Sequence, residues 1–199
     1  MLDDMYEFKT DIAVLLNITP DHLDRYDYKM ENYVASKFRV TQNQTPDDVF
    51  IYCADDPETI KGMIGRTFSA LQLPFSIQKK IEQGGYLDKD NIVINTHQQH
   101  FEMSITELAL QGKHNIYNSL ASGIVARLLE IRDDTLRESL ATFKNIEHRM
   151  ESVGKIPVIQ LMRNIHQHNT AYNHSQVFHQ NRFGPYPALI SQRTDSAVN

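Results

Sequence analysis

The segment Asn17–Tyr26 holds the densest set of side chains that bind ligands or metal ions, in the order Asn-Ile-Thr-Pro-Asp-His-Leu-Asp-Arg-Tyr. Asp21 and Asp24 supply hard carboxylate oxygens, and His22 supplies an imidazole. This donor set suits a divalent cation, and magnesium in particular is usually held by one or two carboxylates together with substrate phosphates. The residue types are therefore compatible with a site for a divalent cation.

The same residues also allow a purely structural interpretation. Asp21 would cap the segment that follows, Asp24 would pair with Arg25, and His22 would lie on the surface. Lys37 would extend its amine past a mostly apolar helix face into water. Residue types alone leave both interpretations open, because Asp-His-x-Asp is a short motif.

Two further stretches carry polar side chains at useful spacing. Asn115 and Asn118 are three residues apart near the start of an expected helix, so their carboxamides can face one way and suit the edge of a nucleobase. Helix capping by Asn115, with Asn118 solvated, is the structural alternative. His148 and Arg149 follow in a charged stretch that otherwise reads as a helix end, and the fork of an Arg guanidinium suits phosphate.

Short apolar runs and helical periodicities predict the elements that position these residues. The run from Asp11 to Asn17 is typical of a buried strand, and ligands in open α/β sheets bind beyond the carboxyl ends of such strands. Further strands are expected at Val49–Cys53, Leu73–Ile77 and Asn91–Asn95, the last after a Gly84-Gly85 turn. Helices are expected at Met30–Val40, from Gly112 with a stripe of Ile116, Leu120, Ile124 and Leu128, and from Asp133 with Leu136, Leu140 and Phe143 facing inward. The alternation predicts an α/β fold with a largely parallel sheet flanked by helices.

Composition changes near Lys155. Residues 1–155 contain 17 Lys or Arg and 24 Asp or Glu, a net charge of −7, whereas residues 156–199 carry +2 and are rich in His, Asn and Gln. Ile156–Gln160 is compatible with a strand, but Arg163 to Gln180 shows neither a period of 3.6 nor one of 2. We therefore expect residues 1–155 to form the folded part. We expect residues 156–199 to be an atypical tail that is poorly ordered or non-native, the latter through a reading-frame error or a fusion.

The whole chain has 199 residues, a net charge of −5 and one cysteine, Cys53. This charge argues against a protein that coats nucleic acid. The longest apolar runs are far below the ~20 residues that cross a bilayer, and the acidic N-terminus does not resemble a signal peptide. A single cysteine excludes an internal disulfide and fits a reducing compartment. A soluble, cytoplasmic protein without nucleic-acid or membrane partners is expected.

Three stretches, in order, resemble motifs of the Mur ligase family, the ATP-dependent amide ligases that build the peptide of peptidoglycan. Asn17–Tyr26 followed by Tyr33-x-x-Ser-Lys37 resembles the signature of the central domain, and Asp24-Arg25-Tyr26 is most similar to the member that adds D-glutamate. Gly112–Asn118 resembles Gly-x-His-Asn-x-x-Asn, and Phe143–Glu151 resembles Phe-x-x-x-x-His-Arg-x-Glu. The resemblance spans about Leu2 to Gly154.

The resemblance implies a chemistry for each motif. His22 and Lys37, carbamylated on its amine, would hold Mg²⁺, Asn115 and Asn118 would contact adenine, and Arg149 would lie near the nucleotide; Asp21, Arg25 and His148 are second-rank candidates. The substrates would be UDP-N-acetylmuramoyl-L-alanine, D-glutamate and ATP. Their reaction would form an amide through an acyl phosphate, in an enzyme that is a monomer when intact.

The chain departs from the family pattern in two places. It contains no Gly-x-x-x-x-Gly-Lys-[Ser/Thr] sequence, the phosphate-binding loop that the family carries upstream, and the resemblance ends at about Ile156. We therefore expect an incomplete central domain, inactive as a ligase by itself. Two alternatives stay open: another Mur-type or folylpolyglutamate-type ligase, and a non-catalytic nucleotide- or protein-binding remnant.

Overall fold

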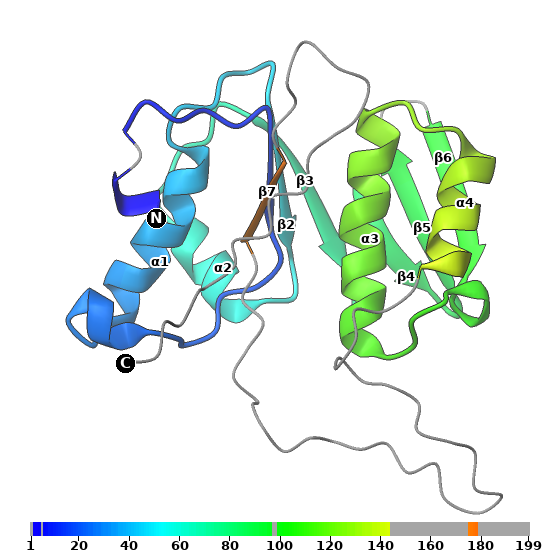
Figure 1. The fold of residues 1–199 in the computed structure, drawn as a ribbon, viewed down its shortest axis with the longest axis horizontal. Coiled ribbons are helices and arrows are strands. Elements are labelled where there is room, and N and C mark those ends of the chain that lie inside the picture. Colours follow the sequence, from blue (N-terminus) through cyan, green and yellow to red (C-terminus); the bar gives the residue numbers. More distant parts are fainter. Residues whose placement is uncertain (1, 5, 97–98, 144–174, 179–199) are drawn as a thin grey trace, which may run out of the picture.

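The computed structural model describes residues 2–4, 6–96, 99–143 and 175–178. These residues form an α/β structure in which one mixed sheet carries helices on both faces (Figure 1). The strands are β1 (Ile12–Leu15), β2 (Val49–Cys53), β3 (Leu71–Ser76), β4 (Gly84–Asp88), β5 (Asn91–Thr96), β6 (Gln99–Ser104) and β7 (Ser175–Phe178). The α-helices are α1 (Met30–Phe38), α2 (Pro57–Met63), α3 (Lys113–Leu128) and α4 (Asp133–Thr142). Short 3-10 turns lie at Leu2–Asp4 (η1), Leu23–Tyr26 (η2), Arg39–Thr41 (η3) and Ile105–Glu107 (η4).

The strand order is β6-β5-β4-β3-β2-β1-β7. Neighbours from β1 to β4 run parallel, whereas β4, β5 and β6 form an antiparallel meander and β7 pairs antiparallel with β1. The expected parallel arrangement therefore holds for the part that carries the first motif, and the sheet as a whole is mixed. The short hairpin connections around β5 dictate the antiparallel part, since parallel neighbours usually need a longer crossover.

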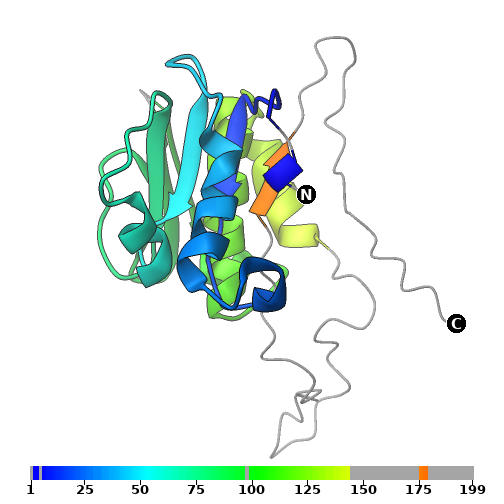
Figure 2. The ribbon, with the colours of Figure 1, turned by 90° about the vertical axis from the view of Figure 1, so that its left-hand side faces the viewer.

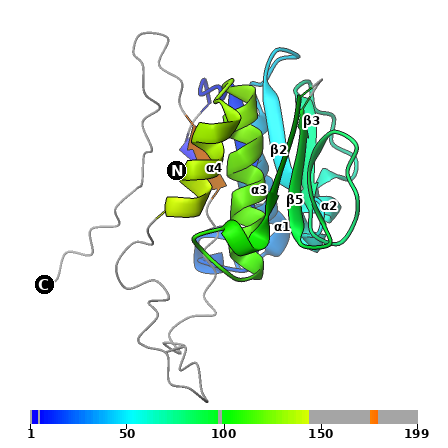
Figure 3. The same ribbon diagram turned by 90° about the vertical axis from the view of Figure 1, so that its right-hand side faces the viewer.

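Alternation along β1 divides the core into two layers. Successive strand side chains point to opposite faces, and Val14 packs into the cluster under α3, whereas Ala13 and Leu15 pack into the cluster under α1. All three are at most 2% exposed. Figure 2 looks onto the α1 and α2 side, and Figure 3 shows α3 and α4 on the other side of the strands. β1 is therefore buried on both faces, as its unbroken apolar run predicts.

The predicted long helix is confirmed as α3. Leu120 and Ile124 are fully buried against the sheet, while Ile116 and Leu128 at the two ends of the stripe are partly buried. Gly123 lets the helix approach β5 closely, because a Cβ at this position would lie 2.2 Å from Ile94 Cδ1. The stripe at i, i+4 spacing is thus the surface that fixes α3, and with it Asn115 and Asn118, on the sheet.

Several details differ from the sequence-based expectations. Phe143 was expected to face inward and is 57% exposed, because α4 ends at Thr142 before it. Gly84 and Gly85 begin β4 instead of forming a turn; at Gly84 φ is +132° and a Cβ would lie 2.0 Å from the Pro74 carbonyl oxygen, so the close approach of two strands requires glycine there. α2, β4, β6 and β7 were not predicted, and the expected strand Ile156–Gln160 lies outside the described residues.

Candidate active site

The loop that leaves the carboxyl end of β1 is tied to the start of α2 by one carboxylate. The Ile18 backbone N–H donates to Asp56 Oδ2 at 3.1 Å, and the same oxygen accepts from Thr59 N at 2.8 Å and Thr59 Oγ1 at 2.6 Å. Asp56 thereby caps the N-terminus of α2, as Asp does at such positions, with Pro57 in the first turn. Just before this anchor, Asn17 has a buried Oδ1 with no hydrogen-bond partner among the described residues.

His22 has a backbone conformation that residues other than glycine rarely adopt. Its φ is 48°, and Asp27 and Tyr28 in the same connection also lie in the left-handed region, at 54° and 57°. Each such residue costs about 1 kcal/mol or more relative to the right-handed region. The His22 side chain is 68% exposed, and its Nε2 lies 3.6 Å from Asp21 Oδ2. The loop thus presents the imidazole to solvent beside a carboxylate.

Lys37 lies in the last turn of α1 and is half-buried. Burial lowers the pKa of its amine below the usual 10.5, and the nearby carboxylates of Asp21 and Asp3 oppose that shift only in part. Its Nζ is 5.1 Å from the centre of the Tyr33 ring, a cation–π distance. A lowered pKa increases the fraction of neutral amine at pH 7, which is the form that acts as a nucleophile.

Tyr26 connects the 3-10 turn η2 to α1. Its hydroxyl donates to Asp3 Oδ2 at 3.1 Å and lies 3.1 Å from Ser36 Oγ, and its ring meets Tyr33 edge-on at 5.2 Å between centroids. This network places the Asp-His-x-Asp segment against the helix that carries Lys37. Sequence reasoning did not identify Tyr26, Ser36 and Asp3 as positioning residues, although Tyr26 and Ser36 belong to the motif itself.

A cation site here needs more than the unmodified side chains. Within residues 2–4, 6–96, 99–143 and 175–178, no group of three or more His, Cys, Asp and Glu side chains has the geometry of a metal site. The structure brings Asp21 next to His22 and within electrostatic reach of Lys37. An ammonium repels a cation, but a carbamate on the same amine would add oxygen ligands of the kind Mg²⁺ prefers. With a carbamate on Lys37, the side chains of Asp21, His22 and Lys37 would offer the types of donor that Mg²⁺ accepts.

The two asparagines lie on the other face of the sheet, at the start of α3. Asn115 is partly buried, and its Nδ2 donates to the Gln111 carbonyl at 2.8 Å; Asn118 is exposed one turn later. The N-cap position is Gly112, so Asn115 does not cap the helix in the way the structural alternative proposed. The Oδ1 atom of Asn115 and the carboxamide of Asn118 are the groups of this turn that suit the edge of a nucleobase.

Asp55 ties this helix to the sheet. Its carboxylate accepts from Ser76 Oγ at 2.6 Å, Ile77 N at 2.7 Å and Tyr117 Oη at 2.9 Å, so it links the ends of β2 and β3 to α3. Burial, and then the Asp55 carboxylate, raise the pKa of Tyr117 far above that of a free tyrosine. The turn Asp55-Asp56 was expected from the sequence, but neither residue was identified as a positioning residue.

Three predicted features remain without a structural test. His148 and Arg149 lie outside the described residues, and so does the boundary near Lys155.

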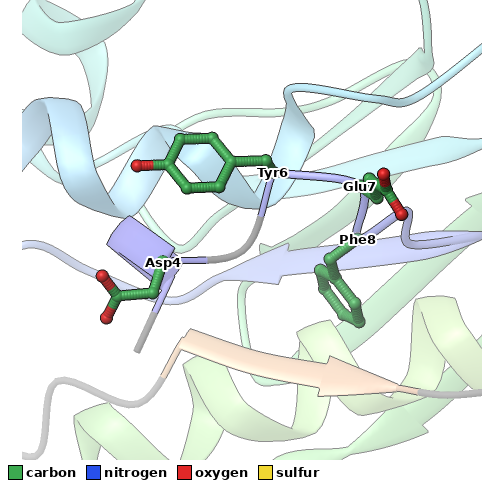
Figure 4. A pocket seen from close by; sticks show the side chains of 4 residues that line it. All are labelled: Asp4, Tyr6, Glu7 and Phe8. Carbon is green, nitrogen blue, oxygen red and sulfur yellow. The ribbon is translucent and has the colours of Figure 1, made fainter.

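Figure 4 shows an open hollow lined by Asp4, Tyr6, Glu7 and Phe8, on the segment that precedes β1. None of the predicted site residues lines it, so it has no part in the site.

Comparisons with known proteins identify the family. Residues 1–126 match the model of the Mur ligase middle domain. The chain belongs to the Mur ligase family.

Curated relatives match 155 residues of this Mur ligase chain. A UDP-N-acetylmuramoylalanine--D-glutamate ligase from Christiangramia forsetii is 54% identical over 155 residues, which is 78% of this chain and 35% of that protein. The ligase of the same name from Bacteroides fragilis is 47% identical over the same length and share. The chain therefore spans about a third of the length of the curated relatives it matches.

Solved structures confirm the fold of this Mur ligase domain. The match to MurF from Acinetobacter baumannii covers 74% of this chain and 32% of the MurF chain, with a TM-score of 0.57 at 19% identity. The match to a pseudomurein peptide ligase type C from Methanothermus fervidus covers 74% of this chain and 37% of that ligase, with a TM-score of 0.53 at 20% identity.

The described residues include no helix long and apolar enough to span a membrane.

Proposed function

We propose that this chain is the ATP-binding part of a cytoplasmic ligase that adds D-glutamate to UDP-N-acetylmuramoyl-L-alanine. The observation that carries the proposal is the 54% identity, over 78% of the chain, to a relative named for that reaction. Asp24-Arg25-Tyr26, the triplet that resembles the D-glutamate-adding member, agrees with it. The reaction joins a carboxylate to an amine at the expense of ATP, through an acyl phosphate.

In this proposal Lys37 becomes an oxygen ligand. Its neutral amine attacks CO₂, a proton leaves the nitrogen, and the carbamate that results carries the negative charge. The half-buried position of Lys37 and its lowered pKa support this step. The carbamate and His22 would hold Mg²⁺, with Asp21 next to the imidazole and Arg25 on the same loop as second-rank groups. Bound there, Mg²⁺ would neutralise phosphate charge.

Nucleotide recognition is proposed for the start of α3. Asn115 and Asn118 would contact adenine, and Asp55 would hold Tyr117, and with it this turn of α3, at a fixed place against β2 and β3. Arg149 would meet the phosphates, with His148 beside it.

A hybrid enzyme tests the proposed function. Residues 1–155 would replace the matching segment of the Christiangramia forsetii ligase, to which this chain is 54% identical over 155 residues. We expect ATP-dependent phosphate release that requires UDP-N-acetylmuramoyl-L-alanine and D-glutamate. His22→Ala and Lys37→Arg should reduce it at least about 100-fold, since each removes a metal ligand. Lys29→Arg, at the exposed start of α1, is the matched control. A folded hybrid that is inactive, or whose activity is indifferent to Lys37, would refute the proposal.

The chain by itself is proposed to be inactive as a ligase, with residues 156–199 a non-family tail. The supporting observation is the lack of a Gly-x-x-x-x-Gly-Lys-[Ser/Thr] sequence within the 199 residues. Calorimetry with ATP and Mg²⁺ separates a weak nucleotide-binding remnant, which gives heat, from a pure interaction module, which gives none. Any Lys37-dependent turnover by the isolated chain would contradict the proposal of inactivity.

A further inference from the structure

Asp55 and Asp56 follow the carboxyl end of β2, inside the sheet. β2 pairs with β1 on one side and with β3 on the other. The Ala54 backbone N–H donates to the Phe75 carbonyl at 2.8 Å, so the chain stays tied to β3 up to the residue before this pair. The two carboxylates therefore extend from a well-anchored part of the backbone.

The two side chains serve opposite faces of the sheet. Asp56 accepts from the Ile18 backbone N–H, and Ile18 is buried in the cluster under α1. Asp55 accepts from the Tyr117 hydroxyl, and Tyr117 packs against the cluster under α3. Two neighbouring residues thus hold elements that the sheet separates.

Each of these hydrogen bonds lies close to one group of proposed ligand-binding residues. Ile18 precedes His22 by four residues on the same loop, and Tyr117 lies between Asn115 and Asn118 on α3. Hydrogen bonds to such supporting residues orient the groups that bind a metal ion or a ligand. The placement of the loop relative to the turn of α3 consequently depends on two adjacent carboxylates.

We propose that Asp55 and Asp56 are positioning residues with separate duties in the ligase reaction. Asp56 places the loop that carries His22, and thereby sets how well Mg²⁺ is held. Asp55 places the turn of α3 that carries Asn115 and Asn118, and thereby sets how well the base of ATP is held. This inference rests on the proposed function, from which it takes the metal-binding role of the loop and the base-binding role of the turn.

The bonds to Asp56 all converge on one oxygen. Oδ2 accepts from Ile18 N, Thr59 N and Thr59 Oγ1. A carboxamide also has one acceptor oxygen, which can take the place of Oδ2, and Asn caps a helix as well as Asp does. Asp56→Asn should therefore keep the loop in place, whereas Asp56→Ala should release it.

The bonds to Asp55 are divided between both of its oxygens. Oδ1 accepts from Ser76 Oγ, and Oδ2 accepts from Ile77 N and Tyr117 Oη. Asparagine at this position would turn its NH₂ group toward a donor, so it is no conservative replacement. Tyr117→Phe is the mildest variant, because it removes one hydrogen bond and keeps the edge-on contact with Phe75 at 6.1 Å between centroids.

Hydrogen exchange in the full 199-residue chain tests the two contacts without any ligase activity. The Ile18 amide should exchange at least about tenfold faster in Asp56→Ala and at about the wild-type rate in Asp56→Asn. Tyr117→Phe should instead accelerate exchange at Asn115 and Ile116, whose amides bond to the Gly112 carbonyl. Exchange in β5 reports general destabilisation and serves as the reference. Equal acceleration at Ile18 and Asn115 in the same variant would overturn the proposal.

Kinetics of the hybrid ligase tests the separate duties. Asp56→Ala should lower kcat at least about tenfold and raise the Mg²⁺ concentration for half-maximal rate by a similar factor, and Asp56→Asn should restore both. Tyr117→Phe should raise KM for ATP about fivefold and leave kcat within about twofold, because it weakens base binding in the ground state and the transition state alike. Tyr86→Phe, which removes the hydroxyl of a buried tyrosine on β4, is the matched control.

The unsubstituted hybrid separates failure of the proposed function from failure of the duties of Asp55 and Asp56. A folded hybrid without activity refutes the proposed function, and the two duties fall with it. An active hybrid in which Asp56→Ala and Tyr117→Phe change KM for ATP and kcat in the same proportion overturns only the separate duties. Asp56→Asn that is as impaired as Asp56→Ala overturns the positioning role of Asp56.

Discussion

Helices α1 and α3 cover opposite faces of one sheet and carry different kinds of residues. α3 has 16 residues, and Leu120 and Ile124 at its centre are fully buried. α1 has 9 residues and follows a connection with left-handed residues at His22, Asp27 and Tyr28. The α3 face thus carries the longer and more deeply buried helix, whereas the connection into α1 contains three left-handed residues and α1 carries a half-buried amine; next to α3, Glu130 at φ 57° is the left-handed residue with a side chain. Strained backbone and a buried ionisable group together are typical of functional sites.

Truncation in the core should show the largest difference between the faces. Ile124→Ala should lower the free energy of unfolding by about 3 kcal/mol, because it leaves a cavity in the large cluster under α3. Val34→Ala on α1 removes less apolar volume from the smaller cluster and should cost about 1–2 kcal/mol. Urea denaturation measures both values. A larger loss of unfolding free energy in Val34→Ala than in Ile124→Ala would contradict the proposed difference between the two faces.

The Asp55 hydrogen bonds should have the next largest effect. Asp55→Ala leaves three donors without their acceptor, those of Ser76, Ile77 and Tyr117, and should cost about 2–3 kcal/mol. Tyr117→Phe removes one of these bonds and should cost about 1 kcal/mol. Equal losses in the two variants would mean that Asp55 acts only through Tyr117.

Acid should weaken the domain through Asp48. Burial acts to raise the pKa of this carboxyl, but hydrogen bonds from Lys9 at 2.6 Å and from Thr45 outweigh it, so the net pKa lies below the usual 3.8. A depressed carboxyl pKa stabilises the fold at pH values above the unfolded pKa, and the contribution is lost as pH falls through the folded value. Thermal melts between pH 6 and pH 3 should therefore drop less steeply for Asp48→Asn than for the wild type. Parallel curves would contradict this role for Asp48.

Substitution of Lys37 should have the smallest effect on stability but a large effect on ligase activity. Because burial disfavours its charged form, Lys37→Met should change the free energy of unfolding at pH 7 by no more than about 1 kcal/mol, in either direction. In the hybrid ligase the same change should abolish activity. A strongly destabilised Lys37→Met would instead assign this lysine a structural role.

The sequence predicted the parts of the fold that follow from unbroken patterns. The apolar run before Asn17 predicted β1, and the i, i+4 stripe from Ile116 predicted α3, because both depend on burial of side chains along one element. Asp133 and Leu136 likewise predicted α4. Phe143 was placed wrongly because its apolar character says nothing about where the helix ends.

The missed features depend on contacts between distant residues. β4 begins with two glycines and β6 reads Gln-His-Phe-Glu-Met-Ser, so neither shows a clear strand pattern before its neighbours are known. β7 is recognisable only through its pairing with β1. At the site, the motif predicted His22 and Lys37, but the link from Tyr26 to Asp3 and the link from Asp55 to Tyr117, 62 residues apart, appear only in three dimensions.

Carbon-13 NMR of the full chain in ¹³C-labelled bicarbonate tests the central claim most directly. The account predicts a carbamate signal at pH 7–8 that is present in the wild type and in Lys29→Arg, is absent in Lys37→Arg, and shifts when Mg²⁺ is added. The same carbamate signal in Lys37→Arg as in the wild type, or no carbamate signal in a folded wild-type chain, would contradict it.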